Sequence, residues 1–205
     1  MLSFENINIS IDNKKIINNI SLTLFPGTVI CVHGQNGTGK TSFLNILSSL
    51  SKPQTGKIYF NDYDINQALD EYQSFVTYIG HNNVLDEELT VVENLRFWAK
   101  IRNMEHALNA SLVLFNLSQY SNTAVSKLSQ GFKKKVELTK LLLTQTVIWL
   151  LDEPFVNLDH AGKTNLLELI NTKAANNGII ILTAQEPMFD TKRNIVNLSL
   201  QDYSL

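Results

Sequence analysis

Residues 34–41 limit the possible folds of this 205-residue chain more than any other segment. They read Gly-Gln-Asn-Gly-Thr-Gly-Lys-Thr and fit the pattern G-x-x-x-x-G-K-[ST] without a mismatch. The apolar run 29–33 before them predicts a buried strand, and the apolar spacing of 41–50 after them predicts a helix. Such a strand–loop–helix junction gathers backbone N–H groups at the positive end of a helix. The sequence therefore predicts a phosphate-binding loop in an α/β fold.

The residue types in this loop predict how it would hold a nucleotide. Lys40 would bridge the β- and γ-phosphates, and the Thr41 hydroxyl would ligate Mg²⁺. We therefore expect ATP and Mg²⁺ as cofactors. The predicted nucleotide-binding residues of the loop are Gly34, Gln35, Asn36, Gly37, Thr38, Gly39, Lys40, Thr41 and Ser42.

A second element ends in two adjacent carboxylates. The hydrophobic run 147–151 predicts a buried strand, and Asp152 and Glu153 follow it directly. In α/β folds, ligands collect at the carboxyl ends of the strands. We expect Asp152 to hold Mg²⁺ and Glu153 to polarise the attacking water as the catalytic base. A solvated acidic turn is the alternative, which the phosphate-binding loop makes less favourable.

The remaining segments complete the predicted α/β frame. Apolar and polar residues alternate over the first 30 residues, with a turn at Asp12 and Asn13, which predicts an antiparallel, hairpin-rich entry. Residues 57–60 predict another strand. A mainly helical segment follows, with helices expected at 91–102 and 105–117, and the pattern returns to strand–helix–strand at 147–151, 163–176 and 179–183. The helical segment reads as an insert in the alternating frame.

Composition excludes several classes of protein. The formal net charge is −2, so no basic field favours nucleic acid or a membrane surface. Cys31 is the single cysteine; it allows no internal disulfide and is expected to be a small core residue. Neither a signal peptide nor a run of about 20 apolar residues is present, so we expect no membrane span. Any association with a membrane would then depend on partner proteins.

A third motif narrows the family. Leu128-Ser129-Gln130-Gly131-Phe132 stand between the phosphate-binding loop and the acidic pair, ahead of an amphipathic helical pattern. On its own this motif is weak, because serine commonly caps helices. In this order and spacing the three motifs resemble those of the ATP-binding cassette (ABC) ATPases.

The resemblance implies a fold and an assembly. It implies one ABC nucleotide-binding domain over residues 1–205, with a RecA-like core, an antiparallel β subdomain and a helical subdomain at about 83–130. Ser129 and Gly131 would complete a nucleotide site built on another subunit, so the resemblance implies a homodimer on ATP binding. Leu158 and Asp159 match the D-loop, which contacts the opposite subunit in ABC ATPases.

Several positions depart from the ABC pattern. His81 stands where most ABC ATPases have the Q-loop glutamine, and we expect it to act in catalysis and in sensing the metal. Gln185 stands where the switch histidine is expected; its amide can donate to a γ-phosphate but cannot become a cation, which predicts slow hydrolysis. Ile11 takes the place of an adenine-stacking aromatic. Phe132 and the following lysines replace the usual polar-then-arginine continuation.

The segment Tyr78-Ile79-Gly80-His81 is similar to the CcmA family of cytochrome c maturation ATPases. This resemblance implies that ATP turnover serves haem export or the release of a haem-loaded chaperone in c-type cytochrome biogenesis. It implies polytopic CcmB-like and CcmC-like membrane subunits as partners. It also implies a peripheral position on the cytoplasmic face of the inner membrane.

Other interpretations stay open at this point. The chain could serve another small ABC transporter, act as a soluble ABC regulator, or be an ATP-binding regulatory subunit that hydrolyses poorly. Two surface questions also remain. We expect Lys133, Lys134 and Lys135 to form a solvated helix face rather than a nucleic-acid site. We expect Phe97 and Trp98 to be core residues of the helical insert rather than partner contacts.

Overall fold

The computed structural model describes residues 1–11, 14–191 and 194–203, with the side chains of Ile11 and Lys14 outside the description. The expected turn at Asp12 and Asn13 and the substitution noted at Ile11 therefore lie outside the described residues. The chain divides into two compact units. The first comprises Met1–Gly80, Thr146–Glu153 and Ile170–Leu205, and the second comprises His81–Gln145 and Pro154–Leu169. The assignment of one domain to 1–205, with a helical subdomain at about 83–130, stays a prediction.

The first unit contains the predicted antiparallel sheet. Among the described residues its strands lie in the order β2-β1-β4-β5, and every pair is antiparallel. The strands are β1 Leu2–Ile11, β2 Lys14–Leu24, β4 Thr55–Phe60 and β5 Tyr63–Asp64. The register shifts between Phe4 and Ile7, so the apolar alternation of β1 slips by one residue there and both side chains stay buried.

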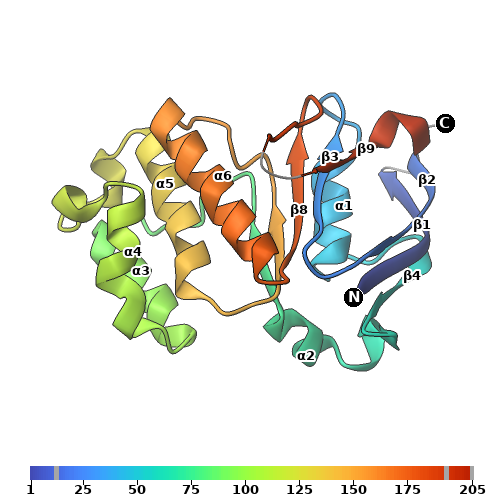
Figure 1. The fold of residues 1–205 in the computed structure, drawn as a ribbon, viewed down its shortest axis with the longest axis horizontal. Helices are drawn as coiled ribbons and strands as arrows, with labels where there is room; N and C mark the ends of the chain where they lie inside the picture. The colour runs from blue at the N-terminus through green and yellow to red at the C-terminus, as the bar shows by residue number, and fades with distance from the viewer. Residues whose placement is uncertain (12–13, 192–193, 204–205) are drawn as a thin grey trace. The chain divides into compact units, whose positions relative to one another are not determined.

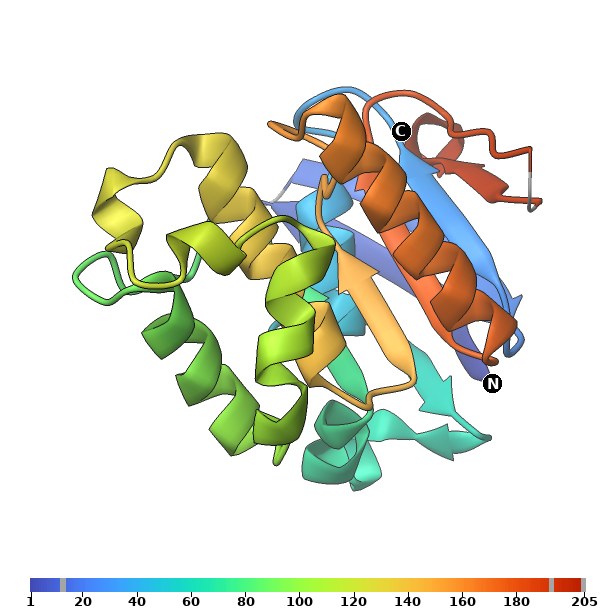
Figure 2. The same cartoon turned by 60° about the vertical axis from the view of Figure 1, so that its left-hand side comes forward.

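A parallel sheet forms the other half of this unit. Its described strands lie in the order β6-β7-β8-β3-β9, and Figure 2 shows neighbouring strands of this sheet side by side. They are β3 Val29–His33, β6 Val76–Ile79, β7 Ile148–Leu151, β8 Ile179–Ala184 and β9 Val196–Ser199. Since the strands are parallel, β3, β7 and β8 end at one edge of the sheet. The phosphate-binding loop, the acidic pair and Gln185 follow these three strands.

Helix α1, Lys40–Leu47, packs within the same unit against both sheets (Figure 1). Its Phe43 ring meets the Phe4 ring of β1 edge-on, with centroids 5.4 Å apart. Apolar residues of α1, β1, β3, β7 and β8 form one buried cluster, which includes Ile30, Leu44 and Ile148. This cluster holds the first turn of α1 in place beneath the loop.

Several short elements of this unit have little signal in the sequence. The 3₁₀ turn η1 Ile65–Gln67 and the helix α2 Leu69–Ser74 lead from β5 to β6, and the 3₁₀ turn η6 Leu200–Tyr203 follows β9. We did not predict α2, β6 or β9. Each has only four to six residues, too few for a hydrophobic period to be recognised.

The second unit is helical, as the sequence predicts for residues 83–126. Thr90 and Glu93 form a reciprocal capping box that fixes the start of α3. Helices α3, α4 and α5 pack together (Figure 2), and α6 begins in this unit and ends in the first. The elements are α3 Val91–Ile101, η2 Glu105–Ala107, α4 Leu108–Leu114, η3 Ser118–Tyr120, η4 Val125–Lys127, α5 Gln130–Thr139, η5 Lys140–Leu143 and α6 His160–Ala175. Among the described residues, no helix is both long and apolar enough to cross a bilayer.

Two expectations about side chains in this unit are wrong. Lys133, Lys134 and Lys135 are all buried, since α5 packs against both α3 and α4. Consecutive helical residues point about 100° apart, so three in a row cannot share one solvated face. The expectation for Phe97 and Trp98 is wrong for Phe97, which is 67% exposed on α3 and is not a core residue, whereas Trp98 is half-buried.

Candidate functional site

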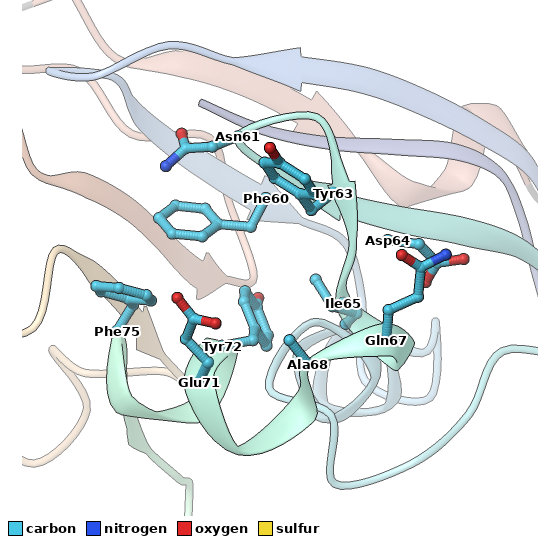
Figure 3. A pocket seen from close by; sticks show the side chains of 10 residues that line it. All are labelled: Phe60, Asn61, Tyr63, Asp64, Ile65, Gln67, Ala68, Glu71, Tyr72 and Phe75. Atoms are coloured by element: carbon cyan, nitrogen blue, oxygen red, sulfur yellow. The ribbon is translucent and has the colours of Figure 1, made fainter.

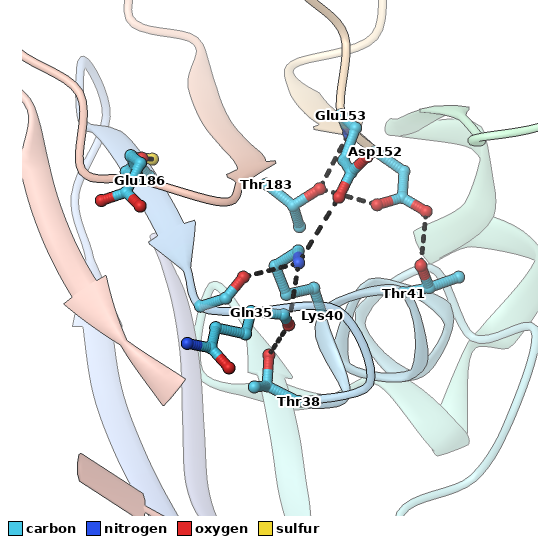
Figure 4. Close-up of polar contacts among 10 residues, drawn as sticks. Gln35, Thr38, Lys40, Thr41, Asp152, Glu153, Thr183 and Glu186 are labelled. Carbon is cyan, nitrogen blue, oxygen red and sulfur yellow. Dashed lines mark hydrogen bonds and ion pairs between the residues drawn. The ribbon is translucent and has the colours of Figure 1, made fainter. Parts of the chain in front are cut away.

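The loop 34–39 joins β3 to α1 and closes as a tight turn (Figure 4). The Gly34 amide donates to the carbonyl of Ala184 at the end of β8, 3.3 Å away. The Thr38 hydroxyl donates to the Gln35 carbonyl across the loop at 2.9 Å. Gly39 has a φ of 91°, and a Cβ there would lie 2.9 Å from the Ile16 side chain. A glycine is therefore required at the last position before the helix.

The N-terminus of α1 is left open by this geometry. Among the described residues, no side chain caps it at Gly39, and its first turn holds no acidic residue. The first N–H groups of a helix have no partner within the helix and sit at its positive end. The start of α1 can therefore accept an anion such as a phosphate.

Lys40 is buried at this helix start and already has partners. Its Nζ donates to the carbonyl oxygens of Gly34 at 2.7 Å and Gln35 at 3.2 Å. It also lies 3.4 Å from Glu153 Oε1, so the two predicted catalytic elements meet in an ion pair (Figure 4). Both side chains of the pair are largely buried, which makes this interaction less screened than a surface ion pair.

Asp152 lies buried at the end of β7 with a hydroxyl on each carboxylate oxygen. Thr41 Oγ1 donates to Oδ2 at 2.7 Å, and Thr183 Oγ1 donates to Oδ1 at 2.6 Å. A buried carboxylate needs such donors, because burial without hydrogen bonds is costly. Thr41 and Asp152, the two predicted magnesium ligands of this unit, are thus in direct contact. A hydroxyl and a carboxylate are hard oxygen donors that fit Mg²⁺.

Thr183 is the residue of this site that sequence reasoning missed. Besides donating to Asp152, its hydroxyl accepts a hydrogen bond from the Glu153 amide at 2.8 Å. Glu153 has a φ of 44°, an unfavourable backbone conformation for a residue with a side chain. Thr183 therefore holds the backbone turn that separates the two carboxylates. A single hydroxyl at the end of the apolar strand β8 was the signal that could have revealed it.

Two neighbouring groups of the first unit stay neutral. Burial, with a smaller contribution from the Asp152 charge, raises the pKa of the Tyr78 phenol to about 12. Burial raises the pKa of the Cys31 thiol to about 11, and Cys31 is a buried free cysteine as expected. Neither group can therefore serve as an acid or base near neutral pH.

The Leu128–Phe132 motif lies in the second unit, where Ser129 and Gln130 are exposed and the other three residues are half-buried. The Ser129 side chain accepts a hydrogen bond from the Phe132 amide at 3.3 Å and caps α5. A Cβ on Gly131 would lie 2.7 Å from the carbonyl oxygen of Asn157, so the glycine permits a close backbone approach. Lys135 lies 2.9 Å from Asp159, and this contact lowers the pKa of the Asp159 carboxyl. The chain around the predicted signature therefore contacts the chain around the predicted D-loop within one molecule.

The remaining predicted site residues have varied surroundings. Gln185 is exposed just after β8. His81 is the first residue of the second unit, and its side chain is exposed. In the loop and helix start, Gln35, Asn36 and Gly37 are exposed and Ser42 is half-buried. The roles predicted for Ser129, Gly131, His81 and Gln185 stay predictions.

Comparison with known proteins identifies the family. The family model described as ABC transporter matches residues 17–156. This chain belongs to the ABC transporter ATP-binding proteins. It is the ATPase subunit of an ABC transporter, and the expected ABC fold, with a parallel sheet and an antiparallel subdomain, is confirmed.

Several curated relatives share one name. The cytochrome c biogenesis ATP-binding export protein CcmA of Wolbachia pipientis wMel is 38% identical over 89% of this chain and 88% of its own length. CcmA of Rickettsia bellii is 36% identical over 90% and 92%. A solved putative ABC transporter ATP-binding protein from Pyrococcus furiosus superposes with a TM-score of 0.85 at 25% identity, covering 100% of this chain and 99% of its own. These similarities cover nearly the whole chain and extend to the two sheets and the helical unit.

Proposed function

We propose that this ABC ATPase subunit energises haem export or haem-chaperone release in c-type cytochrome biogenesis. The observation that carries the proposal is the similarity to CcmA proteins along almost the whole chain, at 38% identity for the Wolbachia relative and 30% over 98% of this chain for that of Vibrio vulnificus. The chain would work with CcmB-like and CcmC-like membrane subunits. Its place would be peripheral, on the cytoplasmic face of the inner membrane, attached through these partners alone.

The contacts of the first unit suggest how hydrolysis would proceed. The start of α1 would receive the ATP phosphates, and Lys40 would turn from Glu153 to the β- and γ-phosphate oxygens. Glu153 would then be released to accept a proton from the attacking water. Thr41 and Asp152 would hold Mg²⁺, which neutralises phosphate charge when bound. The Lys40–Glu153 pair would thus keep the base occupied until nucleotide arrives.

The second unit would complete the site of another subunit. Ser129 and Gly131 would contact the γ-phosphate held by a second copy, at the N-terminus of α5. A solved ABC cassette, MJ0796, is described as a dimer bound to ADP and Pi, and shares this fold with a TM-score of 0.79 at 20% identity. His81 would sense the metal and the state of the membrane partner.

An exposed apolar pair on α3 supports the proposal that a partner protein contacts the second unit. Phe97 is 67% exposed and Ile101 is 58% exposed. Residues four apart share one face of a helix, so the two side chains form one apolar surface. Apolar surface of this kind is where a membrane subunit would contact the second unit.

Gln185 supports a second candidate, a subunit that binds ATP but hydrolyses it poorly. We expect Gln185→His to raise the turnover number about tenfold to a hundredfold, because an imidazolium adds a charge-assisted contact of about 1.5–3 kcal/mol to the γ-phosphate. The measurement is steady-state ATPase activity of the purified chain. Glu186→His is the matched control, since Glu186 is the next exposed residue. Equal turnover numbers for Gln185→His and the unchanged chain would show that Gln185 does not limit ATP hydrolysis.

Co-purification from membranes tests the haem assignment. The tagged chain is isolated from its own membranes in mild detergent, the polytopic partner is sequenced and bound haem is measured by absorbance. We expect a CcmB-like partner, and loss of assembled c-type cytochromes when Glu153→Gln replaces the normal chain. A lipid or amino-acid permease as partner would overturn the haem assignment and leave the ATPase assignment intact.

A further inference from the structure

A hollow of about 460 Å³ opens on the first unit beside the β4–β5 hairpin, η1 and α2 (Figure 3). Four of its lining residues are aromatic: Phe60, Tyr63, Tyr72 and Phe75. The Phe60 ring is 5.1 Å from that of Phe75 and 6.0 Å from that of Tyr72. Tyr72 is buried, and its hydroxyl donates to the Leu47 carbonyl. The aromatic wall is therefore held by the core, while Tyr63 is 74% exposed at the rim.

The Glu71 carboxylate points into this hollow between the rings (Figure 3). Among the described residues, the structure shows no hydrogen bond or ion pair to this carboxylate. Asp64 also lines the hollow, but its carboxylate accepts from Asn66 and lies 3.7 Å from Lys57. Glu71 is thus the anion that remains available to a ligand.

The charge of the surrounding segment decides which ligands can bind. Residues 58–80 contain Asp62, Asp64, Asp70 and Glu71 and no lysine or arginine. Two cations lie beside the hollow: Lys57, next to Asp64, and the Met1 ammonium, which donates to the Asn61 side chain at 2.7 Å. Both cations are already paired with groups of the hollow, so the Glu71 carboxylate, unpaired among the described residues, disfavours phosphates, carboxylates and anionic lipid head groups. A cation placed over aromatic rings and beside a carboxylate is attracted by both. The hollow therefore suits an ammonium or a guanidinium group.

We propose that this acidic aromatic hollow receives an arginine side chain from a cytoplasmic loop of the membrane subunit. Cytoplasmic loops of polytopic membrane proteins carry an excess of arginine and lysine, which complements this segment of the chain. Arginine suits the site better than lysine, because its planar guanidinium stacks on rings and binds carboxylates through two N–H groups. The identity of the partner rests on the function proposed above, whereas the cation site does not.

The cation site can be tested on the isolated, full-length chain. N-acetyl-arginine amide is titrated while the aromatic NMR signals of Phe60 and Phe75 are followed. We expect saturable shifts, no binding of the neutral isostere N-acetyl-citrulline amide, and about tenfold weaker binding of the arginine probe in Glu71→Gln. Asp70→Asn is the matched control, since Asp70 precedes Glu71 in α2 but does not line the hollow. Absence of saturable shifts, or equal losses in the two variants, would overturn the cation site.

The docking role is tested in membranes that contain the partner. We expect Glu71→Lys to lower the membrane-bound fraction of the chain about tenfold, and Asp70→Lys to lower it less than twofold. The ATPase activity of each purified variant should match that of the unchanged chain. Full retention of Glu71→Lys on membranes would overturn the docking role even if arginine binds. An unchanged chain that never associates with membranes would contradict the proposed function instead, and would leave the arginine titration valid.

Discussion

Helices α1 and α5 both begin within a glycine-containing motif predicted to contact phosphate, yet their first turns differ. The start of α1 follows Gly39 and has no side-chain cap among the described residues. The start of α5 is capped by Ser129, whose side chain accepts from the Phe132 amide at 3.3 Å. The α1 end is therefore preformed for an anion. At the start of α5, the Phe132 amide already donates to the Ser129 side chain. Ser129 must therefore exchange this long, weak hydrogen bond for a contact with phosphate.

The lysines of the two helices show the same contrast. Lys40 pairs with Glu153, whose side chain is only 12% exposed. Lys135 pairs with Asp159, which is 62% exposed. Water and salt screen the second pair, so it contributes little to stability. The first pair is shielded, and loss of one partner leaves the other charge buried. The α1 site is thus the more sensitive of the two to substitution.

The largest effect is expected for Lys40→Met, which removes the ammonium but keeps much of the stem. ATP affinity should fall about a hundredfold or more, because two charge-assisted phosphate contacts are lost. Titration with a fluorescent ATP analogue measures the change. The double variant Lys40→Met, Glu153→Gln removes both charges. It therefore separates the loss of phosphate contacts from the effect of an unpaired, buried Glu153 charge. An affinity within threefold of the unchanged chain would show that the α1 end does not bind phosphate.

Thr183→Val tests whether the α1 site depends on its neighbouring strand. The variant keeps the side-chain shape but removes the hydroxyl that contacts Asp152 and the Glu153 amide. We expect the turnover number to fall about tenfold or more, as positioning is lost, with a smaller change in KM for ATP. Thr183→Ser should restore turnover. Unchanged turnover in Thr183→Val would remove Thr183 from the site.

Gly131→Ala tests the packing of the α5 motif. The added methyl would lie 2.7 Å from the Asn157 carbonyl oxygen, and relief of that contact should cost about 1–3 kcal/mol of unfolding free energy. Urea unfolding measures the loss. Gly37→Ala is the counterpart in the α1 loop. Apart from its chain neighbours, no described atom lies within 4 Å of a Cβ added at Gly37. The expected loss of unfolding free energy, about 1–2 kcal/mol, therefore comes from the left-handed backbone alone. Unchanged stability in Gly131→Ala would mean that the loop around Asn157 yields freely.

The smallest effect is expected for Ser129→Ala. Loss of the cap should lower the unfolding free energy by about 1 kcal/mol, which shifts the melting temperature by about 2–4 °C for a chain of this size. Ser129→Asp keeps a capping oxygen and should keep the stability, but its charge should repel a phosphate and lower ATP-dependent dimerisation. Calorimetry and size-exclusion chromatography with ATP distinguish these two results. Equal stability in Ser129→Ala would show that the hydrogen bond to Phe132 contributes nothing.

Sequence patterns predicted those elements whose apolar runs or motif spacing lie within a single segment. The strand at Val29–His33 is a short apolar run, and Asp152 directly follows another. The α1 loop is recognisable because its glycines and Lys40 must stand at fixed spacing. The burial of Lys133–Lys135 was not readable in this way. It depends on how α5 packs in the second unit and on carboxylates such as Glu87 and Asp159, which lie far away in the sequence.

The family, the phosphate-binding loop and the acidic pair could therefore be recognised in the sequence, since their chemistry depends on consecutive residues. The contacts that hold these residues in place depend on the tertiary structure. Parallel pairing sets Leu151 beside Leu182, which brings the Thr183 hydroxyl to Asp152 and Glu153 although 30 residues separate Glu153 from Thr183. The hollow beside Glu71 likewise depends on α2, a helix too short to be predicted from its sequence. Contacts between distant segments follow from sheet register and packing, which no single stretch of sequence contains.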